Sequence, residues 1–219
     1  MDKEEPLIYI HQGIMTSYRI PGYNKILEAN KGLNILYGQP HKNSSLQNGD
    51  IPNNKYIKIR NIYLGQKKEF FIAKIFRIIF INRPNVIVTQ YSFSNLSIWG
   101  LYMIRPFLKF KIIGWNHGWD RRTGFNPKTS VKDRVRLFML RQADAMIFYS
   151  EDALEKLSKY TNREKLFVAN NTLDTTPLLD LKSNFKKSSK QELKKEVGFN
   201  SKYNLIFSAR LEPAKNPKK

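Results

Sequence analysis

The sequence contains no cysteine and only three histidines. Disulfides, thiolate metal sites and a cysteine nucleophile are therefore excluded, and a structural zinc site is not expected. No stretch approaches about 18 uninterrupted apolar residues, so no membrane-spanning helix is predicted. The first residues, MDKEEPLIYIHQG, lack the basic region and the long apolar region of a signal peptide. We therefore expect a cytoplasmic protein.

Common phosphate-binding and catalytic motifs are also missing. The sequence has no GxxxxGKS/T, GxGxxG, HExxH or GxSxG pattern. It has no DxD-type acidic pair, which argues against a metal-chelating nucleotide-sugar site, so we expect neither a metal nor a cofactor. Zinc-finger, helix-turn-helix and RNP-type signatures are absent too, and we expect no specific nucleic-acid partner.

Acidic residues are scarce, because 38 Lys and Arg outnumber 18 Asp and Glu, for a net charge of +20. Residues 61–142 alone carry fifteen basic and three acidic side chains. This concentration favours an anionic partner such as lipid headgroups, nucleic acid or a phosphorylated substrate. The segment KKEFFIAKIFRIIFINR suits a helix at an anionic membrane surface, and it equally suits a helix packed on a sheet. A solvated lysine-rich surface is the alternative to a membrane-binding one.

Apolar strands alternate with helical segments along the chain. Strands are predicted at residues 7–11, 33–37, 56–60, 85–90, 111–115, 145–149 and 166–169, and helices at 23–30, 69–82, 94–107, 130–141 and 151–159. This order predicts an α/β fold with a doubly wound, Rossmann-like parallel sheet. We assign residues 1–172 to this domain and 173–190 to a polar, basic linker. Residues 191–219 supply one helix and one strand, which we expect to begin a second Rossmann-like domain that is cut off.

Two polar segments follow predicted strands, at the edge where open α/β sheets bind ligands. The first, HQGIMTSYR, offers a flexible backbone at Gly13, a hydroxyl at Tyr18 and a cation at Arg19. The alternative is an ordinary loop between a strand and a helix.

The second segment, WNHGWD, follows the apolar residues FKIIG and includes Trp115, His117, Gly118 and Asp120. His117 can exchange a proton or donate a hydrogen bond near neutral pH. Trp and Asp side chains are common sugar-binding groups, by stacking and by hydrogen bonds. A histidine that caps a turn, with tryptophans in the core, is the alternative.

The last stretch, YNLIFSARLEPAKNPKK, predicts a buried strand at 204–208 followed by Arg210 and Lys215. These two cations come just past the carboxyl end of that strand, where an open α/β sheet binds phosphate-bearing ligands.

Several segments together resemble the bacterial glycosyltransferase family 4, which has the two-domain GT-B architecture. They are YR-P-Y (Tyr18, Arg19, Pro21, Tyr23), RPNVIVTQ, IIGWNHG, RQADAMIFYSEDALEKL, REKLFVANNTLD and LIFSARLEPAKNP. The resemblance covers nearly the whole chain. Ala209 departs from the glycine that the family often has before the arginine.

The resemblance implies retaining transfer of a sugar from a nucleotide-sugar, usually without a metal, to an acceptor held by the N-terminal domain. It places His117 near the reacting sugar, Gly13 close to the donor diphosphate and the acceptor, and Tyr18 and Arg19 in the acceptor loop. Trp115 and Asp120 are assigned to the acceptor side as well. Arg210 and Lys215 match the pair that holds the donor diphosphate and stabilises the leaving group.

The sequence ends before the family's Glu-x7-Glu motif. We therefore expect residues 1–219 alone to have little or no transferase activity. One interpretation is a severed enzyme of surface polysaccharide synthesis that acts on a lipid-linked or saccharide acceptor at the inner face of the membrane. The other is a non-catalytic acceptor- or membrane-binding module that needs a partner chain with the donor domain.

Overall fold

The computed structural model describes residues 5–51, 54–64, 70–119, 124–185, 189–199 and 203. The chain divides into two units, residues 1–173 and 174–219. None of the helices in the described ranges is long and apolar enough to cross a membrane.

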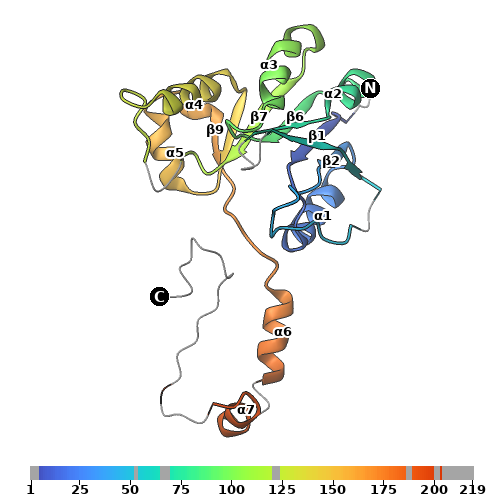
Figure 1. The fold of residues 1–219 in the computed structure, drawn as a ribbon, viewed down its shortest axis with the longest axis vertical. Helices are drawn as coiled ribbons and strands as arrows, with labels where there is room; N and C mark the ends of the chain where they lie inside the picture. Colours follow the sequence, from blue (N-terminus) through green and yellow to red (C-terminus); the bar gives the residue numbers. More distant parts are fainter. Residues whose placement is uncertain are drawn as a thin grey trace. The chain divides into compact units, whose positions relative to one another are not determined.

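The first unit is built on a seven-stranded sheet with the strand order β3-β2-β1-β6-β7-β8-β9, and every neighbouring pair is parallel (Figure 1). The strands are β1 (Ile8–Gln12), β2 (Leu33–Tyr37), β3 (Tyr56–Lys58), β6 (Val86–Gln90), β7 (Lys111–Asn116), β8 (Ala145–Phe148) and β9 (Leu166–Val168). Each of them corresponds to a strand predicted from the sequence. The prediction of a Rossmann-like parallel sheet is confirmed.

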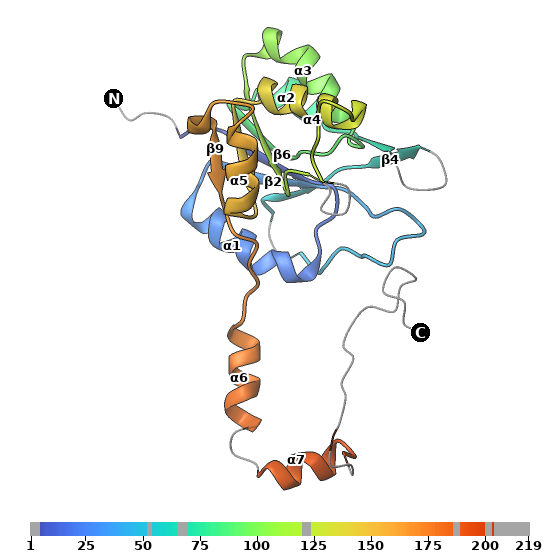
Figure 2. The same cartoon turned by 90° about the vertical axis from the view of Figure 1, so that its left-hand side faces the viewer.

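Helices cover both faces of the sheet (Figure 2). Helix α1 (Ile20–Ala29), which follows the short helix η1 (Ser17–Arg19), packs against Ile10 and Ile35 on one face. The other face carries α2 (Phe76–Asn82), α3 (Ser97–Leu108), α4 (Val131–Gln142) and α5 (Glu151–Ser158), and a short helix η2 (Arg163–Lys165) leads into β9. Neighbouring residues of β1 point to opposite faces, since Tyr9 joins the core under α2 and α3 whereas Ile10 joins the core under α1.

The helix predicted at residues 69–82 is wrong in its first half. Instead, β4 (Asn61–Leu64) and β5 (Phe70–Ala73) form an antiparallel pair, and α2 begins only at Phe76. The backbone N–H of Phe71 donates to the carbonyl of Ser94 at 2.9 Å, and that of Ala73 donates to Oγ of Ser97 at 2.6 Å. These partners come from distant segments. The aromatic and β-branched residues at 70–73 are compatible with an apolar helix as well as a strand, and tertiary hydrogen bonds determine that they form a strand.

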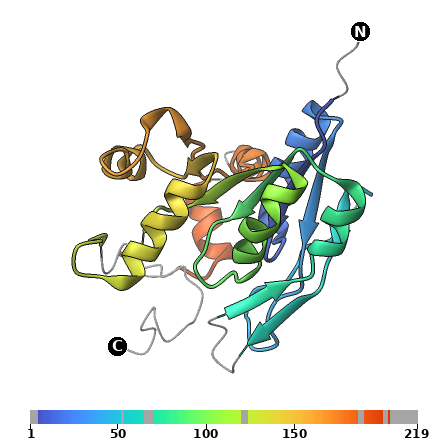
Figure 3. The same cartoon turned by 90° about the horizontal axis from the view of Figure 1, so that it is seen from above.

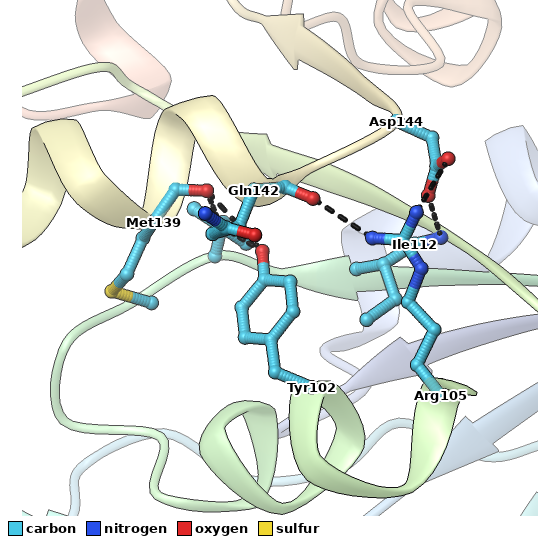
Figure 4. Close-up of polar contacts among 7 residues, drawn as sticks. Tyr102, Arg105, Ile112, Met139, Gln142 and Asp144 are labelled. Carbon is cyan, nitrogen blue, oxygen red and sulfur yellow. Dashed lines mark hydrogen bonds and ion pairs between the residues drawn. The ribbon is translucent and has the colours of Figure 1, made fainter. Parts of the chain in front are cut away.

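A polar cluster fixes the amino-terminal edge of β7 and β8 to helix α3 (Figure 4). Arg105 donates to the carbonyl of Gln142 at 2.9 Å and forms an ion pair of 2.9 Å with Asp144. The second carboxylate oxygen of Asp144 accepts from the backbone N–H of Ile112 at 2.8 Å. One carboxylate therefore joins α3, β7 and the turn that enters β8.

The second unit contains α6 (Thr176–Phe185) and α7 (Lys190–Glu196). The segment 173–190, which is predicted from the sequence to be a linker, thus contains all of α6 and the first residue of α7. Helix α7 begins with a capping box, in which Ser189 and Glu192 each bind the backbone N–H of the other. The strand predicted at 204–208 lies outside the described residues.

Candidate functional site

The strand order places a switch point between β1 and β6. From β1 the chain proceeds in one direction to β2 and β3, and from β6 it proceeds in the other direction to β7, β8 and β9. In open α/β sheets, ligands bind outside the carboxyl ends of the strands at such a point. The loops that follow β1, β6, β7 and β8 are therefore the first places to look for a site.

A cavity of about 1070 Å³ opens at the carboxyl ends of β6, β7 and β8. Its wall is strongly aromatic, with Tyr91, Phe93, Trp115, Trp119, Phe125 and Tyr149 among the lining residues. Two cations from α4, Lys132 and Arg136, also line it, and no carboxylate does so among the residues that the structure describes. Aromatic faces and polar groups in one cavity suit a ligand with both apolar and hydroxylated surfaces.

The loop after β7 is held in a defined shape by Asn116. Its side-chain amide donates to the carbonyl of Tyr91 at 2.7 Å, and its Oδ1 accepts from the backbone N–H of Gly118 at 2.7 Å. Gly118 has φ of +89°, a region that residues with a Cβ rarely adopt. His117 lies between these two fixed positions and is exposed at the cavity.

Tyr149, directly after β8, connects the predicted site residues. Its ring centroid lies 4.5 Å from that of His117 and 6.0 Å from that of Trp115. Trp115 in turn contacts Tyr23 of α1 edge to face, at 6.1 Å. Burial raises the pKa of the Tyr149 phenol, and the nearby Arg19 guanidinium partly opposes this shift. The phenol therefore stays protonated near neutral pH and can donate a hydrogen bond.

The loop after β1 reaches the same edge through Arg19. Nη1 of Arg19 donates to Oε1 of Gln12 at 2.9 Å, and the guanidinium lies 5.7 Å from the ring centroid of Tyr18. Tyr18 itself is 45% exposed. Gly13 is buried instead, and its carbonyl accepts from Nδ2 of Asn61 at 2.8 Å. An added Cβ at Gly13 would lie 3.4 Å from Oε1 of Gln90, which is an ordinary van der Waals contact.

A second histidine lies inside the sheet just below this edge. His11 is fully buried, and its Nδ1 lies 3.0 Å from Oγ1 of Thr89 on the neighbouring strand β6. Its Nε2 has no hydrogen-bond partner in the described part of the chain. Burial lowers the pKa of His11 to about 4, so the imidazole is neutral at physiological pH. His11 therefore supports the sheet and does not reach the cavity.

The structure brings Arg19, Trp115 and His117 together around Tyr149, and it places Tyr18 beside Arg19. Asp120, Arg210 and Lys215 lie outside the described residues. Sequence reasoning missed Tyr149, although its position immediately after an apolar strand was a usable signal. Within the described ranges, no group of three or more His, Asp and Glu side chains could hold a metal ion.

No model of a known protein family matches this chain, and no curated protein matches it significantly. Solved structures do resemble its fold. HepE from Anabaena, in complex with UDP, gives a TM-score of 0.48 at 14% identity, covering 87% of this chain and 49% of HepE. UDP-N-acetylglucosamine 2-epimerase from Rickettsia bellii gives a TM-score of 0.48 at 12% identity, covering 88% of this chain and 51% of that enzyme.

UDP-GlcNAc 2-epimerase from Neisseria meningitidis, bound to UDP-GlcNAc, also gives a TM-score of 0.48, at 10% identity and with 89% of this chain and 54% of that enzyme covered. The chain thus spans about half the length of these three proteins. At such low identities the likeness concerns the arrangement of the chain alone.

Proposed function

We propose that residues 1–173 form the acceptor-binding domain of a glycosyltransferase with the GT-B architecture. The reaction would transfer a sugar, with retention of configuration, from a nucleotide-sugar to a saccharide or lipid-linked acceptor, as surface polysaccharide synthesis requires. The observation that carries the proposal is the arrangement of His117: an exposed imidazole, fixed by its loop against Tyr149, at an aromatic cavity on the carboxyl edge of a parallel sheet.

The cavity wall fits the two kinds of surface that a sugar presents. Trp119 and Phe125 offer apolar faces for the C–H groups of a pyranose ring. His117 and the protonated phenol of Tyr149 offer hydrogen-bonding groups for its hydroxyls. His117 is also the one side chain of this set whose ordinary pKa suits proton exchange near neutral pH.

The charge of the same edge fits a phosphate-bearing reactant. Arg19 lies beside Tyr149, and Lys132 lines the cavity together with Arg136, which is paired with Asp133 at 2.8 Å. A nucleotide diphosphate gains negative charge as it departs, so fixed cations aimed at it lower the barrier. In the sequence resemblance, Arg210 and Lys215 supply that role from a donor-binding domain.

Ligand binding by residues 1–219 tests the acceptor part directly. Saturation-transfer NMR with a panel of saccharides and short-chain lipid-diphosphate sugars should detect binding to the wild-type chain. The variant His117→Ala should weaken it about three- to tenfold, the cost of one lost hydrogen bond. Lys25→Ala, an exposed change on α1, is the control and should leave binding unchanged.

Transfer is assayed separately with UDP- and GDP-sugars, for residues 1–219 and for a chain that also carries a donor-binding domain. We expect activity only in the second protein, with His117→Ala lowering it about 10²- to 10⁴-fold if the imidazole exchanges a proton. Saccharide binding without transfer in either protein would favour a non-catalytic acceptor module. Absence of saccharide binding, or binding that ignores His117, would overturn the proposal.

A further inference from the structure

Helices α2, α3 and α4 form one layer on the sheet (Figure 3). The outer surface of this layer is apolar to an unusual degree. Phe107 is 81% exposed, Met103 75% and Ile81 66%. Phe80 on α2 and Phe138 on α4 are each about half exposed. Monomeric soluble proteins rarely gather such side chains on one face without a binding partner.

The same layer carries positive charge with little to oppose it. Residues 70–119 contain six Lys and Arg and no Asp or Glu. The next carboxylates in the described chain, Asp133 and Asp144, are already paired with Arg136 at 2.8 Å and Arg105 at 2.9 Å. Arg77, Arg83 and Lys109, in contrast, are exposed.

Helical spacing puts the apolar and the basic residues on the same outward surface. On α2, Arg77 is followed three and four residues later by Phe80 and Ile81, and on α3, Met103 and Phe107 are four residues apart. On α4, Phe138 lies between Arg134 and Arg141 at the same kind of interval. Its ring stacks on Trp99 of α3, with centroids 6.4 Å apart, so the surface continues from α3 to α4.

We propose that this outer face of α2, α3 and α4 binds the surface of an anionic phospholipid bilayer. The exposed Phe, Met and Ile side chains would enter the interface between headgroups and acyl chains, while the Arg and Lys side chains bind phosphate groups. A second copy of the chain is a poorer occupant. A twofold interface would place this face against itself, with cations opposite cations.

Vesicle flotation tests the proposal, using phosphatidylcholine vesicles with and without phosphatidylglycerol. The wild-type chain should float with the anionic vesicles and not with the neutral ones, and salt should release it. Arg77→Glu combined with Lys109→Glu should lower partitioning by about tenfold or more. Lys25→Glu combined with Lys31→Glu, on and just after α1, gives the same net charge and should change partitioning far less.

The apolar contribution is tested by a matched pair of single variants. Phe107→Ser should lower partitioning about tenfold, whereas Phe167→Ser, which removes a 53% exposed ring from β9, should not. Thermal unfolding of each variant checks that the fold is kept. Equal losses of vesicle partitioning in the test and control variants would overturn the proposal, as would flotation that does not depend on anionic lipid. A dimer, detected by light scattering and dissociated by the same substitutions, would overturn it too. This face lies outside the candidate site, so the result of the flotation experiment does not affect the interpretation of the saccharide-binding experiment.

Discussion

Arg19 donates from Nη1 to Oε1 of Gln12 at 2.9 Å, so its side chain returns to the end of the strand that precedes it. The same guanidinium lies beside Tyr149, which follows β8. Strands β6 and β7 separate β1 from β8 in the sheet. One cation therefore joins two loops that are distant along the edge of the sheet.

Removing that cation should change the titration of Tyr149. Arg19 lowers the pKa of this phenol, against the larger raising effect of burial, so Arg19→Met should raise the pKa further. Tyr23 should shift in the same direction, because Arg19 also lowers its pKa. NMR titration of ¹³Cζ-labelled tyrosines measures both. Arg136→Met is the control, and an unchanged Tyr149 in Arg19→Met would contradict the arrangement.

Buried His11 should make the fold sensitive to mild acid. In the unfolded chain its pKa is the ordinary 6.5, and in the folded protein it is about 4. Between these values the unfolded state binds more protons, so stability falls as the pH falls from about 6.5 towards about 4. Across this pH range the free energy of unfolding should fall by about 3 kcal/mol. Urea unfolding at several pH values measures it.

The contribution of His11 can be separated from that of the carboxylates by substitution. His11→Asn cannot titrate in this range and should flatten the pH dependence, whatever its stability at pH 7. His41→Gln is the matched control: it removes the histidine of the loop after β2 and keeps His11, so it should keep the fall in stability that His11 causes. A wild-type slope in His11→Asn would show that another group is responsible.

Gly118→Ala should destabilise the loop that presents His117. The residue has φ of +89°, and an added Cβ would lie 3.3 Å from side-chain atoms of both Ala153 and Leu157. We expect a loss of about 2 kcal/mol, from backbone strain and crowding together. Gly124→Ala isolates the backbone part, because that residue has φ of +73° with open space around it. Equal losses in the two variants would mean that the contact with α5 is unimportant.

Asp144→Ala should destabilise the protein by about 2 kcal/mol, because it leaves Nη2 of Arg105 and the backbone N–H of Ile112 without their acceptor. Asp152→Ala removes an exposed carboxylate that pairs with Lys156 at 3.1 Å, and should change stability by no more than about 0.5 kcal/mol. Chemical denaturation of both variants gives the comparison. Similar values would contradict the assigned role of Asp144.

The parallel sheet could be predicted because its strands are short apolar runs with clear ends. Segment 85–90, for example, has Pro84 before it and becomes β6. The polar segments with His117 and Arg19 could be placed at one edge for the same reason, since parallel strands end on the same side. The functional roles assigned to these residues remain predictions.

Other parts depend on contacts between distant residues and could not be predicted locally. Residues 70–73 become a strand because Ser94 and Ser97 bind their backbone N–H groups. The role of Tyr149 emerges only when the loops after β1 and β7 are seen on either side of it. Its position at the end of an apolar strand indicates the edge of the sheet, but does not show which loops surround it.

The pairing of His11 with Thr89 joins residues 78 positions apart. During synthesis, β1 therefore leaves the ribosome long before β6, its partner on that side. Until β6 emerges, the nascent chain holds β1 with one unpaired edge, open to β-pairing with other chains. Pairing with β6 closes that edge, so we expect the nascent chain to be less prone to such pairing once residues 86–90 have emerged.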